Sequence, residues 1–92
     1  MADDSVRDWL VERTFSDDEQ NIVILVYATP DGECYLRKER ALTSFTGPAR
    51  ETHAALDVES RTLAPVGDPD TVARYATDAS RMAEVHAPTA VV

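Results

Sequence analysis

The hydrophobic pattern is strongest in the first third of the chain, from Asn21 to Thr29. Apolar side chains fill both alternating sets of positions there, so a strand would be hydrophobic on both faces. One face would carry Ile22, Ile24 and Val26, and the other Val23, Leu25 and Tyr27. Both faces of this strand must therefore be covered by other parts of the fold.

A turn signal, Thr29-Pro30-Asp31-Gly32, follows this strand. Proline sets φ at the first turn position and glycine accepts a positive φ, so the pattern predicts a β-hairpin from Tyr27 to Leu36. The return strand is expected over Glu33 to Leu42. Its outer half is rich in charge, which is typical of a strand that projects beyond the core or lies at a sheet edge.

The first element is ambiguous. From Arg7 to Phe15, Trp9, Val11 and Phe15 recur at a period of two, with Arg13 as an exception on the apolar side. This pattern favours a strand. A helix from Asp4 to Arg13 is the alternative, because it would place several apolar residues on one stripe.

The second half of the chain predicts helices. Gly47-Pro48 can start a short helix that runs from Pro48 to about Leu56. Residues 61–66 can form a brief extended segment, in which Pro65 is incompatible with a central strand. Asp68 is a suitable N-cap for a long helix that runs to about His86. The apolar stripe of that helix is Val72, Tyr75, Ala76, Ala79, Met82, Ala83 and His86.

These elements predict a single small α+β domain over residues 6–88, in which a three-stranded antiparallel meander packs with a short helix and a long C-terminal helix. Residues 1–5 and 89–92 are expected to be flexible. The predicted core consists of Trp9, Ile22, Ile24, Val26, Tyr27, Leu36, Val72, Tyr75 and Met82.

Composition narrows the environment. With 17 acidic and nine basic residues, the net charge is -8, which argues against a general phosphate-binding surface. The longest apolar run, Ile22 to Ala28, is far too short to cross a bilayer, and no basic-then-apolar leader is recognisable. We therefore expect a soluble cytoplasmic protein without a membrane partner. Cys34 is the single cysteine, which excludes an intramolecular disulfide.

The basic residues are eight Arg and one Lys, and the acids are rich in Asp. An acidic surface that is poor in Lys suits a concentrated-salt cytosol, where charge repulsion is screened. In WLVERTFSDDEQNIVILVYATPDGECYLRKERALTSF and DPDTVARYATDAS, the chain resembles the small, acidic, uncharacterised proteins of extremely halophilic archaea. That resemblance implies no activity. A mesophilic acidic protein is the alternative.

The one basic cluster in the sequence, Arg37, Lys38 and Arg40, lies on the return strand close to Tyr35. A basic and aromatic strand face could bind single-stranded nucleic acid, which is the alternative function. The simpler interpretation is an edge strand whose charges pair across the sheet and discourage aggregation. The strongly acidic net charge favours the simpler interpretation.

Other chemistry is weakly indicated. His53 and His86, with Cys34, are candidates for a weak ligand or metal site, but their spacing does not predict three converging ligands. His86 has a structural use near a helix C-terminus. The serines lie in no nucleophile motif and the three glycines form no phosphate-binding loop. We expect no cofactor, no bound metal and no catalytic residues.

The sequence therefore predicts a non-enzymatic accessory or interaction module. Its central strand has two apolar faces but the chain has one long helix to cover them, so we expect a homodimer. A different protein partner is the second option. In a monomer, the short helix and the 61–66 connector would have to cover the second face.

Overall fold

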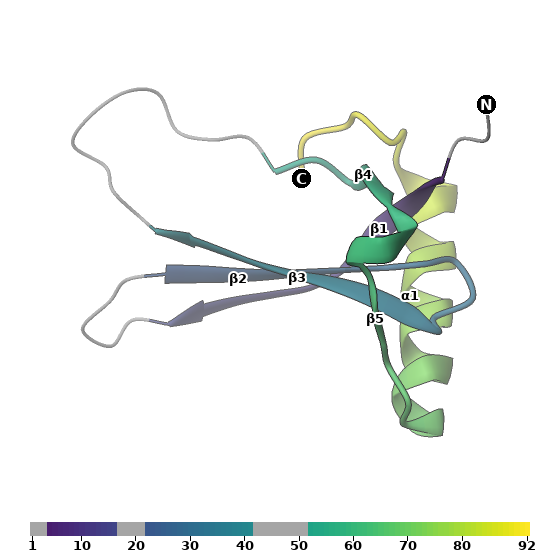
Figure 1. Ribbon diagram of the computed structural model, residues 1–92. Coiled ribbons are helices and arrows are strands. Elements are labelled where there is room, and N and C mark those ends of the chain that lie inside the picture. Colours follow the sequence, from purple (N-terminus) through teal and green to yellow (C-terminus); the bar gives the residue numbers. More distant parts are fainter. Residues whose placement is uncertain (1–3, 17–21, 42–51) are drawn as a thin grey trace.

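The computed structural model describes residues 4–16, 22–41 and 52–92 of the 92-residue chain. An α+β architecture is confirmed: within these residues, one antiparallel sheet packs against one long helix (Figure 1). The elements in chain order are β1 (Ser5–Ser16), β2 (Ile22–Ala28), β3 (Cys34–Ala41), β4 (Ala55–Glu59), the 3-10 turn η1 (Ser60–Thr62), β5 (Ala64–Pro65) and α1 (Pro69–Val85).

Within the described residues the sheet has five strands, in the order β4-β1-β2-β3-β5, whereas the sequence pattern predicted three. The β1–β2–β3 meander is present, and the predicted hairpin joins β2 to β3. β4 extends the sheet beside the first part of β1, where Val6 is opposite Val58. β5 adds two residues at the other edge, and Pro65 lies there rather than in a central strand, as its missing N–H requires.

The first element is a strand, as the period of two indicates, and the helical alternative is wrong. Its register against β2 shifts between Leu10 and Glu12, which marks a β-bulge at Val11. One extra residue reverses the alternation of side chains beyond it. The bulge explains why Arg13 breaks the apolar pattern of the sequence: it lies on the opposite face of the sheet from Trp9.

The short helix predicted from Pro48 to about Leu56 is wrong where the structure describes it, and residues 42–51 lie outside the described residues. His53 forms an isolated bridge with Val91, and β4 begins at Ala55. Five residues that alternate in burial suffice for a strand when β1 offers an unpaired edge. In residues 55–59 this tertiary pairing, rather than a helical pattern, sets the structure.

The long helix is confirmed. The Asp68 carboxylate accepts hydrogen bonds from the Thr71 N–H at 3.0 Å and the Thr71 hydroxyl at 2.7 Å, which satisfies one free donor of the first turn. Tyr75 and Ala79 are the buried residues of its apolar stripe. Among the described residues, no helix is long and apolar enough to cross a membrane.

The core has two sides because β2 is buried on both faces. We call the face that packs against α1 the helix side; it carries Trp9, Val26 and Ala28, which meet Tyr75 and Ala79. The opposite face, the far side, carries the buried residues Leu10, Val23, Leu25 and Tyr27.

The far side is covered partly by a pair of segments that the sequence did not predict. The Val92 N–H donates to the Thr52 carbonyl at 2.8 Å, and the Ala54 N–H donates to the Ala90 carbonyl at 2.8 Å. The Tyr27 hydroxyl donates to the His53 carbonyl at 2.9 Å, which ties this pair to β2. These contacts involve Ala90 and Val92, from the segment 89–92 that we expected to be flexible.

The predicted core was half right. Trp9, Val26, Tyr27 and Tyr75 are buried, whereas Ile22, Ile24, Leu36, Val72 and Met82 are partly exposed. In Figure 1 the strands β1, β2 and β3 extend to the left, well past α1. The helix therefore covers only the part of the sheet near the hairpin turn.

Gly32 sets how closely α1 approaches the sheet. The hairpin turn is held by Asp31, whose Oδ1 accepts the Thr29 hydroxyl at 2.6 Å and the Glu33 N–H at 2.9 Å; these bonds, the Thr29 one above all, lower the pKa of that carboxyl. Gly32 follows with φ at +75°, directly against the helix backbone. A Cβ atom there would lie 2.7 Å from the Ala76 nitrogen and closer still to the Val72 carbonyl oxygen.

We expect Gly32→Ala to destabilise the protein much more than Gly67→Ala. Both glycines have positive φ, but a Cβ atom added at Gly67 would meet nothing within 4 Å, so this variant reports the conformational cost alone, about 1–2 kcal/mol. At Gly32 the helix must also move away from the sheet, at a further cost of about 1–3 kcal/mol. Chemical denaturation of the two variants measures the difference. Equal losses would show that α1 does not rest on the hairpin turn.

Candidate functional site

The four residues of the predicted nucleic-acid site do not share one face. Tyr35 and Arg37 are on the helix side, opposite Ala28 and Val26 of β2. Lys38 and Arg40 are on the far side, opposite Leu25 and Val23. Tyr35 packs against the cluster around Val26, so its ring is engaged in the core. The contiguous stretch of sequence is divided into two separate surfaces.

The basic residues also differ in whether they form an ion pair with an acidic side chain. Five described arginines pair with an acidic side chain: Arg7 with Asp57, Arg37 with Glu39, Arg61 with Glu59, Arg74 with Glu12, and Arg81 with Asp78. The three remaining described cations, Arg13, Lys38 and Arg40, pair with no Asp or Glu side chain in the described part of the chain. All three lie on the far side of the sheet.

The strand register brings these cations together. Arg13 of β1 and Lys38 of β3 flank Leu25 in one row, and Phe15 and Arg40 flank Val23 in the next. We call Arg13, Phe15, Lys38 and Arg40 the far-side basic cluster. The sequence pattern missed Arg13 and Phe15 because they belong to another strand, and the bulge at Val11 turns them to this face.

The helix side has a different character beyond the reach of α1. Thr14, Ile22 and Ile24 lie there on adjacent strands, and Ile22 and Ile24 are partly exposed. The charges that border them are paired, Arg37 with Glu39 and Glu12 with Arg74. We call Thr14, Ile22 and Ile24 the open face. The centre of the open face is apolar, and the two ion pairs that border it each have a net charge of zero.

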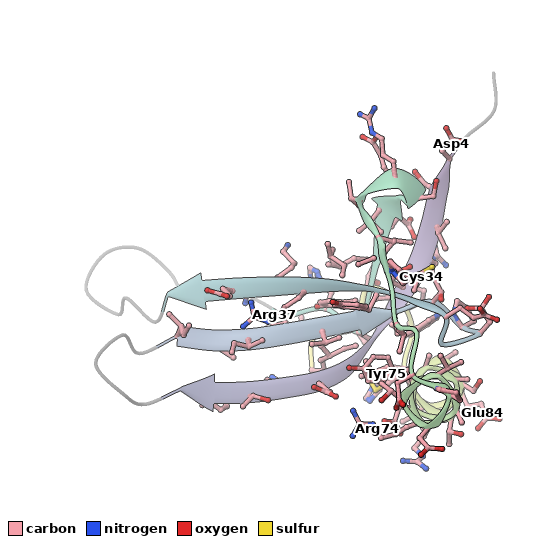
Figure 2. All side chains as sticks on the ribbon, turned by 60° about the horizontal axis from the view of Figure 1, so that its bottom comes forward. Asp4, Cys34, Arg37, Arg74, Tyr75 and Glu84 are labelled. Carbon is pink, nitrogen blue, oxygen red and sulfur yellow. The ribbon has the colours of Figure 1, made fainter. Side chains whose placement is uncertain are left out.

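Glu12 anchors the helix at the border between the covered sheet and the open face. Its carboxylate accepts the Tyr75 hydroxyl at 3.0 Å and pairs with Arg74, whose guanidinium lies 5.2 Å from the centre of the Tyr75 ring. Figure 2 shows Arg74 and Tyr75 on the same side of the helix, below the strands. Burial and the Glu12 charge raise the pKa of Tyr75, so this phenol stays protonated. All three groups are satisfied, which is typical of a structural link.

A buried carboxylate, which the sequence analysis missed, lies on β1. Asp8 is 0% exposed, and neither of its oxygens has a hydrogen-bond partner among the described residues. Burial, together with the charges of Asp31 and Asp57, raises its pKa to about 6. Because Asp8 is fully enclosed, it cannot contact a ligand in this conformation. Its charged form costs stability at neutral pH.

The histidines and the cysteine serve separate parts of the fold. His53 bridges Val91 and offers its carbonyl to Tyr27, while His86 is the C-cap of α1. Cys34 begins β3 and is opposite Pro65. No group of three His, Cys, Asp or Glu side chains within residues 4–16, 22–41 and 52–92 is arranged to hold a metal ion.

Comparison with known proteins places the chain in a family without an assigned role. A family model described as "Family of unknown function (DUF7967)" matches residues 2–92. No curated protein and no solved structure matches the chain. The surfaces described above are therefore the basis for inferring function.

The raised pKa of Asp8 predicts how stability changes with pH. The folded state binds the Asp8 proton more tightly than the unfolded state, so this stabilisation is complete below about pH 4 and is lost as pH rises through about 6. We expect Asp8→Asn to raise the free energy of unfolding at pH 7 by on the order of 1–3 kcal/mol. Between pH 7 and pH 5 the wild type should gain about 1 kcal/mol relative to Asp8→Asn.

Denaturant titrations of both proteins at several pH values measure this difference. Asp31 and Asp57 titrate in the opposite sense, since their pKa values are lowered, and they are common to both proteins. Parallel pH profiles for the wild type and Asp8→Asn would contradict the assignment.

Proposed function

The chain belongs to this family of unknown function, and we propose that it is a non-enzymatic interaction module that works as a homodimer in a high-salt archaeal cytosol. One observation carries the proposal. The central strand presents Ile22 and Ile24 on the open face, beyond the part of the sheet that α1 covers. A face of this kind on a soluble protein is stabilised when another surface covers it.

Charge favours a second copy as the occupant. Each chain carries a net charge of -8, so two copies repel each other in most relative orientations. At the open face the bordering charges are already neutralised as Arg37 with Glu39 and Glu12 with Arg74. Two identical faces related by a two-fold axis can bury their isoleucines against each other without bringing like charges together.

The alternative contact, far side to far side, is disfavoured by the same reasoning. It would place Arg13, Lys38 and Arg40 of one copy against the same cations of the other. Packing through the open face leaves these cations on the outside of the dimer.

The acidic composition fits a concentrated-salt environment. At about 1 M salt the Debye length falls to about 3 Å, so repulsion between two strongly acidic chains is largely screened while apolar burial is retained. Association through the open face should therefore strengthen as KCl is raised. This dependence is opposite to that expected for an interface held by ion pairs.

Ile22→Asp tests the interface, with Val85→Asp as the matched control. Ile24 packs against the core cluster around Val26. A substitution at Ile22 should therefore disturb the fold less than one at Ile24. Val85 is also hydrophobic and is 67% exposed, but it lies at the end of α1. Size-exclusion chromatography with light scattering in molar KCl should give twice the 10.1 kDa chain mass for the wild type and Val85→Asp.

Ile22→Asp should weaken dimerisation by about tenfold or more, because it buries a charge at the centre of the contact. Circular dichroism establishes that each variant is folded at the same salt concentration. A wild type of monomeric mass at every KCl concentration would refute the homodimer and leave the open face to a different protein. An unaltered dimer in Ile22→Asp would refute this face as the contact.

A further inference from the structure

The far-side basic cluster is the one place in the described chain where several cations lie together without an acidic side chain as partner. Five of the eight described basic residues are paired with a carboxylate, and the three that are not lie on the same face. The far-side positions of β1, β2 and β3 beyond the bulge carry no acidic side chain in the described residues. Of the acids of these strands, Glu12 and Glu39 are on the helix side, and Asp8 precedes the bulge and is fully buried. This face therefore gathers three cations in a chain whose net charge is -8.

Two of the cations are held in position by hydrogen bonds to groups other than Asp or Glu side chains. Arg13 Nη1 donates to the main-chain oxygen of Val92 at 3.1 Å, and Arg40 Nη1 donates to the Thr52 hydroxyl at 3.1 Å. Thr52 and Val92 are themselves joined by a main-chain hydrogen bond of 2.8 Å. Each guanidinium uses one donor in this contact and keeps others for an outside acceptor. Lys38 lies exposed across the sheet from Arg13, two strand spacings or roughly 10 Å away.

An aromatic ring lies in the same cluster. Phe15 is 64% exposed and flanks Val23 in the row that ends at Arg40. Arg13 lies two residues earlier on the same face of β1. A large exposed aromatic residue near cations that have no acidic side-chain partner is a combination that stacks unpaired bases and neutralises phosphates.

We propose that the far-side basic cluster binds single-stranded nucleic acid, with Arg13, Lys38 and Arg40 contacting phosphates and Phe15 stacking on a base. Stacking on Phe15 requires an unpaired base, which distinguishes a single strand from a duplex. An acidic protein would use the cations but gain little from the exposed ring. A second copy is disfavoured because the two clusters would repel. This surface differs from the open face, so the two partners do not compete.

Fluorescence anisotropy with a labelled single-stranded oligo-dT tests the proposal, from about 0.1 M to about 1 M KCl. Circular dichroism at each concentration identifies the salt range in which the protein is folded. Two or three neutralised phosphates predict a slope of log K against log salt between about -1.4 and -2. Phe15→Ala should weaken binding by about tenfold at constant slope.

The matched controls separate a specific cluster from net charge. The triple variant Arg13→Gln, Lys38→Gln and Arg40→Gln should lose binding by at least about tenfold and flatten the salt slope. The control is the triple variant Arg37→Gln, Arg61→Gln and Arg81→Gln, which removes the same amount of charge from ion-paired positions. Its affinity for the oligonucleotide should stay within about twofold of the wild type. Ile22→Asp, which tests the dimer, should retain the Phe15-dependent binding.

Several results would overturn the proposal. The first is no binding at any salt concentration at which the protein is folded. The second is an equal loss in the two triple variants, which would assign binding to net charge. The third is a combination of two findings. Polyglutamate or duplex DNA displaces the labelled oligonucleotide as well as unlabelled oligo-dT does, and Phe15→Ala leaves the affinity unchanged. That pattern would identify the cluster as a general site for polyanions.

Discussion

Strand β2 is hydrophobic on both faces, and the need to cover both faces determines the rest of the structure. Leu25 and Tyr27 are almost fully buried on the far side, and Val26 and Ala28 on the helix side. Burial of such side chains contributes about 1.5–3 kcal/mol each, so neither face can be left to water near the core. The hairpin turn and α1 meet on one side, and the paired segments around Thr52 and Val92 pack on the other.

This covering is incomplete at the end of the sheet remote from the hairpin turn, and the two faces differ there. The helix side is apolar with neutralised ion pairs, whereas the far side carries unpaired cations and an exposed ring. The bulge at Val11 produces this division. Without it, Arg13 and Phe15 would fall on the helix side, and the cations of β1 and β3 would lie on opposite faces. One inserted residue therefore decides which side chains act together.

Local signals in the sequence were sufficient for the elements whose geometry is local. The turn around Gly32, the Asp68 cap and the two-faced pattern of β2 predict the hairpin, α1 and the central strand correctly. β4 was missed because a five-residue strand is specified by the free edge of β1 rather than by its own pattern. The buried Asp8 was missed for a related reason: alternation places it in a strand, but only the packed fold shows that it is enclosed without a hydrogen-bond partner among the described residues.

The candidate surfaces were predictable only in part. Lys38 and Arg40 stand out in the sequence as a basic run, but Tyr35 and Arg37 belong to the other face. Assigning Arg13 and Phe15 to the cluster requires the register between β1 and β2 and the position of the bulge, neither of which composition reveals. Ion pairing adds the remaining information, because it shows which cations have an acidic side chain beside them and which do not.

The most direct test of the account is an isotope-filtered nuclear Overhauser experiment on a mixture of labelled and unlabelled chains in molar KCl. It detects contacts between copies one methyl group at a time. A homodimer formed through the open face should give intermolecular signals at the methyl groups of Ile22 and Ile24 and none at Val85. Intermolecular signals confined to other methyl groups, or none at the two isoleucines in a sample of dimeric mass, would contradict it.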